Sequence, residues 1–245
     1  MQTLLYRIYQ LFIALPIAAI LSLLVCLTIT LGSMVGLGKQ VGYLPGKYWG
    51  WLIIKVLLLP VKVEGKEHLT KGQSYIFVAN HQGAFDIFLI YGFLGWNIRW
   101  MMKHELTNIP IFGTACRRSG QILVDNRSVS KIKHCYQEAR EILKGGISLA
   151  VFPEGARTWD GKMRPFKKGA FMLADELQLP VVPMTINGSF TVKPRFKDMF
   201  FCFWSPLKLT IHAPIAPQGY GTDNINQLMK RSFEEIEKDI VYNSL

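Results

Sequence analysis

The 245-residue chain is long enough for one sizeable hydrophobic core; half of its residues are apolar and only 18% are charged. This composition is unusual for a water-soluble domain and favours a protein that contacts lipid. A net charge of +11 predicts an anionic partner, for which anionic lipid, a phosphorylated substrate and nucleic acid all qualify. The four cysteines form no C-x-x-C pair, so the sequence carries no zinc signature.

An uncharged run from Ile8 to Gly38 dominates the N-terminal region and is bracketed by Arg7 and Lys39. A membrane span needs about 20 apolar residues, so the run predicts either one tilted span or a bent helix that enters the bilayer and returns. It is too long for the apolar region of a signal peptide. Residues 1–63 contain no Asp or Glu, and most of their basic residues follow the run, which favours a cytoplasmic location for the remainder of the chain.

A second apolar stretch, residues 48–60, is too short to span a bilayer. It begins with Tyr48, Trp49 and Trp51, aromatic residues that favour the level of the lipid headgroups. We expect this segment to contact the membrane, with a buried core helix as the alternative.

From about residue 62 onward, strand-like and helix-like segments alternate. This alternation predicts an α/β domain with a mixed, mainly parallel sheet flanked by helices. Apolar residues recur at helical spacing over residues 129–143 and 228–240, and both stripes are expected to face the core. The predicted strands are residues 74–80, 98–102, 121–124, 147–152, 180–186 and 207–212.

One predicted strand ends in the sequence FVANHQGAFD, which places a histidine and an aspartate five residues apart. Neither a continuous helix nor a continuous strand brings His81 and Asp86 together at this spacing. A strand–turn–helix junction can do so, with Gly83 easing the turn and Asp86 in the first helical turn. Asp86 could then hold one imidazole nitrogen and leave the other as a base, although such a pair alone is more often structural.

Two further stretches carry basic residues beyond the end of a predicted strand. Residues 151–171, VFPEGARTWDGKMRPFKKGAF, include Arg157 and four other cations, a composition suited to phosphate although a solvated basic loop would look the same. Residues 103–127 begin with Lys103 and end with Arg127. In open parallel sheets, binding sites gather beyond the carboxyl ends of the strands.

Together, the three stretches resemble the 1-acylglycerol-3-phosphate acyltransferases, over about residues 62 to 212. The resemblance is specific because several motifs occur in the family's order and spacing. Three departures are visible: Gly83 replaces a common serine, Ala156 replaces a common threonine, and Asn126 separates Asp125 from Arg127. The matching residues are Asn80, His81 and Asp86; Lys103, Ile109, Pro110, Gly113, Val124, Asp125 and Arg127; Phe152, Pro153, Glu154, Gly155 and Arg157; Phe166 to Phe171; and Val181, Val182 and Pro183.

This resemblance implies that His81 is a general base, which removes the proton from the free hydroxyl of 1-acylglycerol 3-phosphate. The resulting oxygen nucleophile attacks an acyl thioester directly, and the product is phosphatidic acid. Asp86 is expected to orient the imidazole and stabilise its protonated form.

The substrate-binding residues implied by the resemblance are Lys103, Arg127 and Arg157, which would hold the acceptor phosphate, with Glu154 organising their loop. For the oxyanion we expect a backbone N–H near Gly155 or at the helix that follows His81. The acyl donor is acyl-CoA or acyl-carrier protein, and no metal or other cofactor is expected. The implied organisation is N-terminal membrane-associated helices over residues 1–61 and a catalytic domain over residues 62–245, located at the membrane on its cytoplasmic side.

Other functions remain open at this point. The same fold and base could acylate glycerol 3-phosphate or a lyso-amino-lipid. A non-catalytic protein that binds the membrane surface would share the charge and the apolar run, but would not need the His81–Asp86 pair. A serine hydrolase is disfavoured because no Gly-x-Ser-x-Gly motif occurs, and nucleic-acid binding would not account for the long uncharged run.

Overall fold

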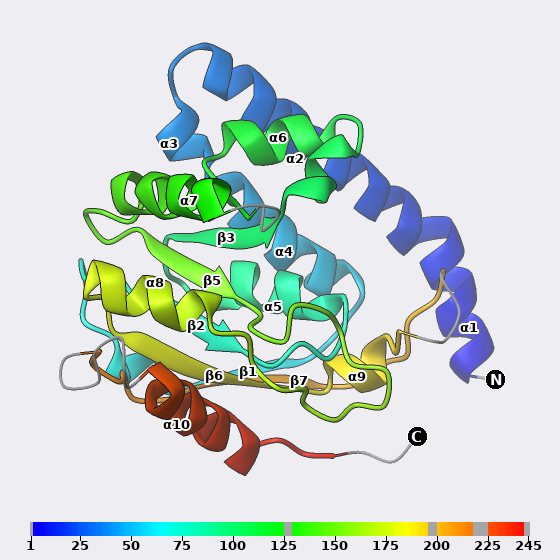
Figure 1. The fold of residues 1–245 in the computed structure, drawn as a ribbon. Helices are drawn as coiled ribbons and strands as arrows, with labels where there is room; N and C mark the ends of the chain where they lie inside the picture. The colour runs from blue at the N-terminus through cyan, green and yellow to red at the C-terminus, as the bar shows by residue number, and fades with distance from the viewer. Residues whose placement is uncertain (1, 125–128, 196–199, 218–224, 243–245) are drawn as a thin grey trace.

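The strands form one seven-stranded sheet in the order β1-β7-β6-β2-β5-β3-β4 (Figure 1). The computed structural model describes residues 2–124, 129–195, 200–217 and 225–242. The β6–β7 pairing is antiparallel and the other pairings are parallel, so the predicted fold class is confirmed. The strands are β1 (Val61–Glu64), β2 (Ile76–Ala79), β3 (Ile98–Lys103), β4 (Ile122–Val124), β5 (Ser148–Val151), β6 (Val181–Asn187) and β7 (Leu207–Ile211).

Six of these strands lie where the sequence predicts them, with boundaries that differ by one or two residues. The prediction missed β1, a strand of four residues at the edge of the sheet. Its alternating sequence, VKVE, directly follows Pro60 and is too short to stand out from the preceding helix. The neighbour of β1 in the sheet is β7, which is distant in the sequence, so only long-range pairing completes this edge.

Helices cover both faces of the sheet (Figure 1). Apolar residues of α7, α8 and α10 pack with Ile76 and Val78 on one face, whereas α4 and α5 pack with Phe77 and Ala79 on the other. The two apolar stripes predicted to face the core correspond to α7 and α10. The longer helices after residue 37 are α4 (Leu44–Val56), α5 (Phe85–Phe93), α6 (Phe112–Arg118), α7 (Val129–Ile142), α8 (Gly169–Leu177) and α10 (Ile225–Lys238). The short ones are α3 (Gly38–Val41), α9 (Ser189–Val192), η2 (Lys66–His68) and η3 (His104–Asn108).

The N-terminal run is helical from α1 (Gln2–Tyr9) through the π-helical turn η1 (Gln10–Ala14) to α2 (Leu15–Met34). This helix is long and apolar enough to cross a membrane, which by itself is weak evidence that it does so. Pro16 explains the π-helical turn, because a proline lacks an N–H and its ring clashes with the carbonyl four residues earlier, here that of Phe12. The chain turns back after α2, through α3 into α4 (Figure 1).

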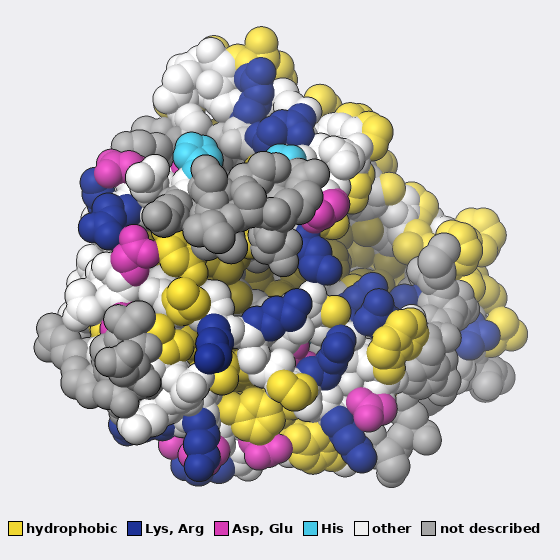
Figure 2. All heavy atoms as spheres, viewed as in Figure 1, with side chains coloured by type: hydrophobic (Ala, Val, Ile, Leu, Met, Phe, Trp, Pro, Cys, Tyr) yellow, Lys and Arg dark blue, Asp and Glu magenta, His cyan; other side chains and the backbone are white. Residues whose placement is uncertain are grey.

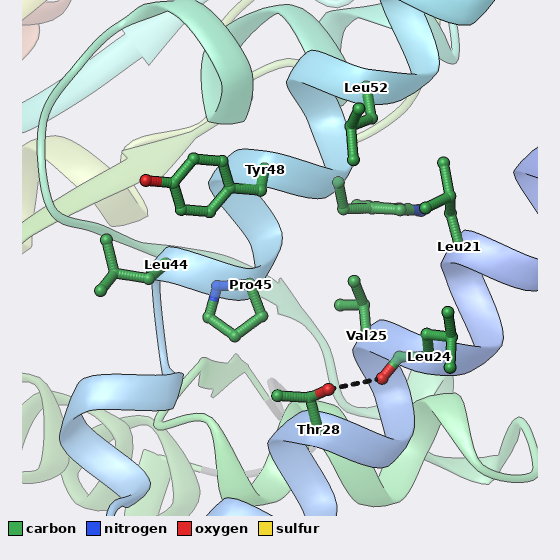
Figure 3. Close-up of a pocket in the computed structure, with 9 residues that line it drawn as sticks. Leu21, Leu24, Val25, Thr28, Leu44, Pro45, Tyr48 and Leu52 are labelled. Atoms are coloured by element: carbon green, nitrogen blue, oxygen red, sulfur yellow. Dashed lines mark hydrogen bonds between the residues drawn. The ribbon is translucent and has the colours of Figure 1, made fainter.

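The second apolar stretch is part of α4, which packs on one side against α5. A Cβ atom on Gly50 would lie 2.7 Å from the carbonyl oxygen of Phe88, so glycine is required for this close approach. On its other side α4 faces α2, and the two helices line an apolar cavity of about 280 Å³ (Figure 3). Tyr48 and Trp51 remain exposed. The division of the chain at residues 61 and 62 stays a prediction.

Candidate active site

The carboxyl ends of three parallel strands carry the predicted site residues to one edge of the sheet. His81 follows β2, the segment from Phe152 to Arg157 follows β5, and Lys103 is the last residue of β3. Because β5 lies between β2 and β3, the histidine and the FPEGAR segment are on adjacent strands. Asn80 braces this edge: its amide exchanges two hydrogen bonds, of 2.9 and 2.8 Å, with the backbone of Ile186 on β6.

His81 and Asp86 meet as predicted, across a turn that leads into α5. The His81 Nδ1 atom lies 2.7 Å from Asp86 Oδ2, and the backbone N–H of Gly83 donates to the same oxygen at 2.9 Å. Asp86 is fully buried in the first turn of α5. A carboxylate only accepts hydrogen bonds, so the neutral imidazole carries its proton on Nδ1. The lone pair is then on Nε2, where a general base needs it.

Gly83 is required for a reason other than the predicted one. Its φ angle is not positive, so the turn does not need the conformational freedom of glycine. A Cβ atom at this position would instead lie 2.6 Å from the hydroxyl oxygen and 2.7 Å from the carbonyl oxygen of Ser189, which is buried at the start of α9. The serine that resembling sequences often carry at this position therefore does not fit against Ser189.

Aromatic stacking holds the plane of the imidazole, through Phe152 and, behind it, Trp100, which the sequence analysis did not single out. The Phe152 ring is stacked on His81 with centroids 3.9 Å apart and 5° between the planes. Trp100 is stacked on Phe152 in turn, at a centroid distance of 5.1 Å. Phe152 belongs to the FPEGAR segment, but only the sheet order, which places β5 between β2 and β3, shows that its ring covers the histidine.

Glu154 joins the two loops of the site. One carboxylate oxygen accepts the backbone N–H of His81 at 2.7 Å, and the other accepts the backbone N–H of Arg164 at 2.8 Å. The backbone N–H of Thr158 donates in turn to the carbonyl oxygen of His81 at 3.0 Å. Glu154 thus contacts the main chain on both sides and is buried. Burial raises its pKa to about 7, while the two N–H donors act in the opposite direction.

This raised pKa predicts a pH dependence of stability. The folded protein binds the Glu154 proton more tightly than the unfolded chain does, because the carboxyl of the unfolded chain has an ordinary pKa of 4.5. Protonation of Glu154 therefore stabilises the folded state, and this contribution is lost as the pH rises through the folded pKa of about 7. Relative to Glu154→Gln, the wild-type free energy of unfolding should increase by about 3 kcal/mol on acidification from about pH 7 to pH 4.5. Urea unfolding in mild detergent at several pH values measures it; a wild type that gains no stability relative to Glu154→Gln on acidification would contradict the prediction.

Gly155 has a φ angle of +75°, which favours glycine, and a Cβ atom there would lie 2.8 Å from the Nζ atom of Lys167. The Lys167 side chain therefore crosses directly over this glycine. The backbone N–H of Gly155 donates to the carbonyl oxygen of Phe152 at 3.0 Å. That N–H is consequently occupied in this conformation, and the expectation of an oxyanion donor near Gly155 or at the start of the helix that follows His81 stays a prediction.

The predicted phosphate-binding cations are only partly brought together. Arg157 is half-buried in the loop after β5, and its carbonyl oxygen accepts a hydrogen bond of 2.9 Å from Arg195. Lys103 is exposed at the end of β3, and no contact with the other predicted site residues appears among the described residues. Arg127 lies outside the described residues. Figure 2 shows Lys and Arg side chains gathered around a recess with hydrophobic side chains at its base.

Arg195 is a residue that the sequence analysis missed. Its guanidinium lies 4.0 Å from the centroid of the Trp159 ring while it donates to the carbonyl oxygen of Arg157. It therefore holds the loop after β5 at two points, and tertiary contact alone reveals this because Arg195 is outside every motif.

Fold and site define an α/β protein in which a partly exposed histidine is paired with a buried carboxylate at the carboxyl edge of the sheet, beside a basic loop. The Acyltransferase family model matches residues 60–187, slightly more than half of the chain. The chain belongs to this acyltransferase family, which confirms the resemblance drawn from the motifs.

The relatives and the structural match agree with this assignment. A 1-acyl-sn-glycerol-3-phosphate acyltransferase of Limnanthes douglasii is 30% identical over 78% of this chain and 67% of its own length. For the alpha enzyme of Homo sapiens the values are 30%, 73% and 66%, and for a chloroplastic enzyme of Brassica napus 31%, 62% and 44%. The crystal structure of PlsC, the 1-acyl-sn-glycerophosphate acyltransferase of Thermotoga maritima, superposes with a TM-score of 0.76 at 28% identity, covering 97% of this chain and 94% of that one. The chain thus spans between 44% and 67% of the length of these three relatives.

Proposed function

We propose that the protein transfers an acyl chain from an acyl thioester to the free hydroxyl of 1-acylglycerol 3-phosphate, forming phosphatidic acid. The observation that carries the proposal is the His81–Asp86 pair in a chain of the acyltransferase family. The ring of Phe152 stacks on the imidazole of this pair, and Glu154 accepts the backbone N–H of His81. The names of the relatives and of the structural match support this acceptor.

In the proposed reaction Nε2 of His81 removes the proton from the acceptor hydroxyl as its oxygen bonds to the thioester carbonyl carbon. Collapse of the tetrahedral intermediate breaks the carbon–sulfur bond, and the imidazolium returns its proton to the departing thiolate. Asp86 stabilises the positive charge on the imidazole in between. The transfer consumes the two substrates alone, so we propose no metal and no further cofactor. The donor is acyl-CoA or acyl-carrier protein, both of which are anionic and carry the acyl chain as a thioester.

We propose that Arg157 and Lys103 bind the acceptor phosphate, together with Arg127. Lys167 joins this proposed set, because its side chain crosses Gly155 beside the histidine loop. The guanidinium group of an arginine can donate two parallel hydrogen bonds to a phosphate, which suits Arg157 to be the main phosphate-binding residue. The same cations would accept glycerol 3-phosphate, which remains the closest alternative acceptor.

Replacing Arg157 with alanine is expected to raise the KM for 1-acylglycerol 3-phosphate by about tenfold to a hundredfold, because a charge-assisted phosphate contact contributes about 1.5–3 kcal/mol. The KM for the acyl donor should change little. Steady-state kinetics in mixed micelles measures both constants. Lys230→Ala is the matched control, since it removes one positive charge from an exposed residue of α10, outside the loop after β5. An unchanged acceptor KM in Arg157→Ala would refute the phosphate contact.

A panel of acceptors tests the function itself. Purified protein in mixed micelles receives one acyl-CoA and, separately, 1-acylglycerol 3-phosphate, glycerol 3-phosphate, monoacylglycerol or a lyso-amino-lipid. Mass spectrometry of the products should identify phosphatidic acid as the main one. A clear preference for an acceptor without phosphate would contradict the proposal, and repeating the best reaction with acyl-carrier protein decides the donor.

We further propose that the protein is associated with a membrane through its N-terminal helix, with the catalytic domain on the cytoplasmic side. The apolar helix from Thr3 to Met34 supports the association. The excess of basic residues that follow this helix supports the orientation.

A further inference from the structure

A group of exposed apolar side chains lies outside the N-terminal helix but next to its first turns. We propose that Leu58 and Trp204 continue the lipid-contacting surface of this helix, so that the catalytic domain itself inserts side chains into the interfacial region of a bilayer. This inference rests on the proposed membrane association and adds a second point of contact, made by segments distant in the sequence. The exposed apolar residues concerned are Leu4, Leu5, Ile8, Leu11 and Phe12 of the helix, and Leu58, Phe200 and Trp204 of the domain.

Leu58 has the backbone conformation usually reserved for glycine. Its φ angle is +57°, and it directly follows Leu57, the C-cap residue of α4. Helices commonly end with glycine in this left-handed conformation, because a Cβ atom makes it unfavourable. The chain nevertheless places a leucine there, and 59% of this leucine is exposed. Neither backbone geometry nor packing within the domain accounts for a leucine, whereas contact with lipid does.

Trp204 is 57% exposed, yet its polar atom is already satisfied by the protein. The indole N–H donates to the carbonyl oxygen of Leu58 at 2.9 Å, which places the indole ring against the main chain of Leu58. A tryptophan whose N–H is hydrogen-bonded within the protein can put its ring into an apolar medium without leaving a donor unpaired. Tryptophan is also the residue type that favours the membrane–water interface.

Hydrogen bonds join the two segments that carry Leu58 and Trp204 to the start of the apolar helix. Tyr6 donates its hydroxyl to the carbonyl oxygen of Leu57 at 2.7 Å, and the buried side chain of Gln10 exchanges two hydrogen bonds, of 2.9 and 2.8 Å, with the backbone of Cys202. Figure 1 shows the segment around residue 202 beside α1. The start of the helix is therefore hydrogen-bonded to both loops, and in the proposed arrangement lipid that covers the exposed side of α1 also reaches Leu58 and Trp204.

The charges nearby fit the headgroups of an anionic bilayer. Arg7 is exposed on α1, with its guanidinium 5.7 Å from the centroid of the Phe201 ring. Lys55 is exposed in the last turn of α4, and its carbonyl oxygen accepts the backbone N–H of Leu58 at 3.0 Å. Cations flanking an exposed apolar group are typical of an interfacial membrane contact.

Fluorescence quenching in reconstituted vesicles tests the contact. Wild type and Trp204→Phe are incorporated into vesicles of phosphatidylcholine and phosphatidylglycerol, with and without bromine on the acyl chains, and the emission lost in the variant is assigned to Trp204. We expect bromolipid to quench this emission and aqueous iodide to leave it nearly unchanged. Quenching by iodide but not by bromolipid would overturn the proposed contact while leaving the membrane association intact. Failure of the protein to enter vesicles would overturn both.

Leu58→Gly provides an independent test, because it relieves the unfavourable backbone conformation while removing the side chain. We expect a higher Tm in detergent, unchanged activity in detergent micelles, and a several-fold loss of activity toward acceptor embedded in vesicles. Met172→Ala is the matched control, since Met172 is a 40% exposed apolar residue on α8, away from α1 in Figure 1. Equal vesicle activities of Leu58→Gly, Met172→Ala and wild type would contradict a lipid contact at Leu58.

Discussion

Replacement of His81 by alanine is expected to abolish acyl transfer, with kcat lower by about 10²–10⁴-fold, the usual contribution of a general base. The fold should survive because residue 81 is tied to the protein mainly through its backbone. Its N–H donates to Glu154 and its carbonyl oxygen accepts from Thr158, and both bonds persist in alanine. The imidazole itself is 14% exposed and adds the contacts with Asp86 and Phe152.

Turnover of 1-acylglycerol 3-phosphate with an acyl-CoA measures this effect, together with thermal unfolding of each protein. His134→Ala is a suitable control, because it removes an exposed imidazole from α7 whose contact with Glu138 is at the surface. A folded His81→Ala protein that turns over at nearly the wild-type rate would refute His81 as the base.

Replacement of Asp86 by asparagine is expected to lower kcat by about 10²-fold or more, with little change in the acceptor KM. Two donors, the Nδ1–H of His81 and the N–H of Gly83, converge on one oxygen of this buried carboxylate. Asparagine can present one oxygen to both donors, but it carries no charge to stabilise the protonated imidazole. Its NH₂ group would also occupy the position of Oδ1, which is buried and has no hydrogen-bond partner among the described residues.

Nitrogen NMR of the His81 ring separates this orienting role from a merely structural one. Wild type should hold its proton on Nδ1, whereas Asp86→Asn should show a larger share of the tautomer protonated on Nε2. A wild-type tautomer combined with wild-type kcat in the variant would show that Asp86 neither orients nor stabilises the imidazole.

Local sequence determined much of this protein. Strand-like segments predicted six of the strands, and several of them are continuous apolar runs, because strands buried on both faces have little room for polar residues. The five-residue spacing of His81 and Asp86 required a strand–turn–helix junction, and the structure confirms it. The motif order and the matched residues 60–187 place the chain in its family. These features depend on residues that are near one another along the chain.

Tertiary structure decided what depends on residues far apart in the sequence. Ser189 accounts for Gly83, Phe152 stacks on His81 and is itself packed against Trp100, and Arg195 holds the loop of Arg157. The edge strand β1 likewise exists through its pairing with β7.

Tertiary structure also decided the pKa of Glu154 and the conformation of the exposed residues Leu58 and Trp204. The raised pKa of Glu154 arises from burial between two loops, and burial is a property of the packed molecule. The unusual conformation of Leu58 and its hydrogen bond with Trp204 join segments 146 residues apart. Spacing along a chain constrains only the geometry of its neighbours, so such contacts emerge when the sheet order and the helix packing bring the segments together.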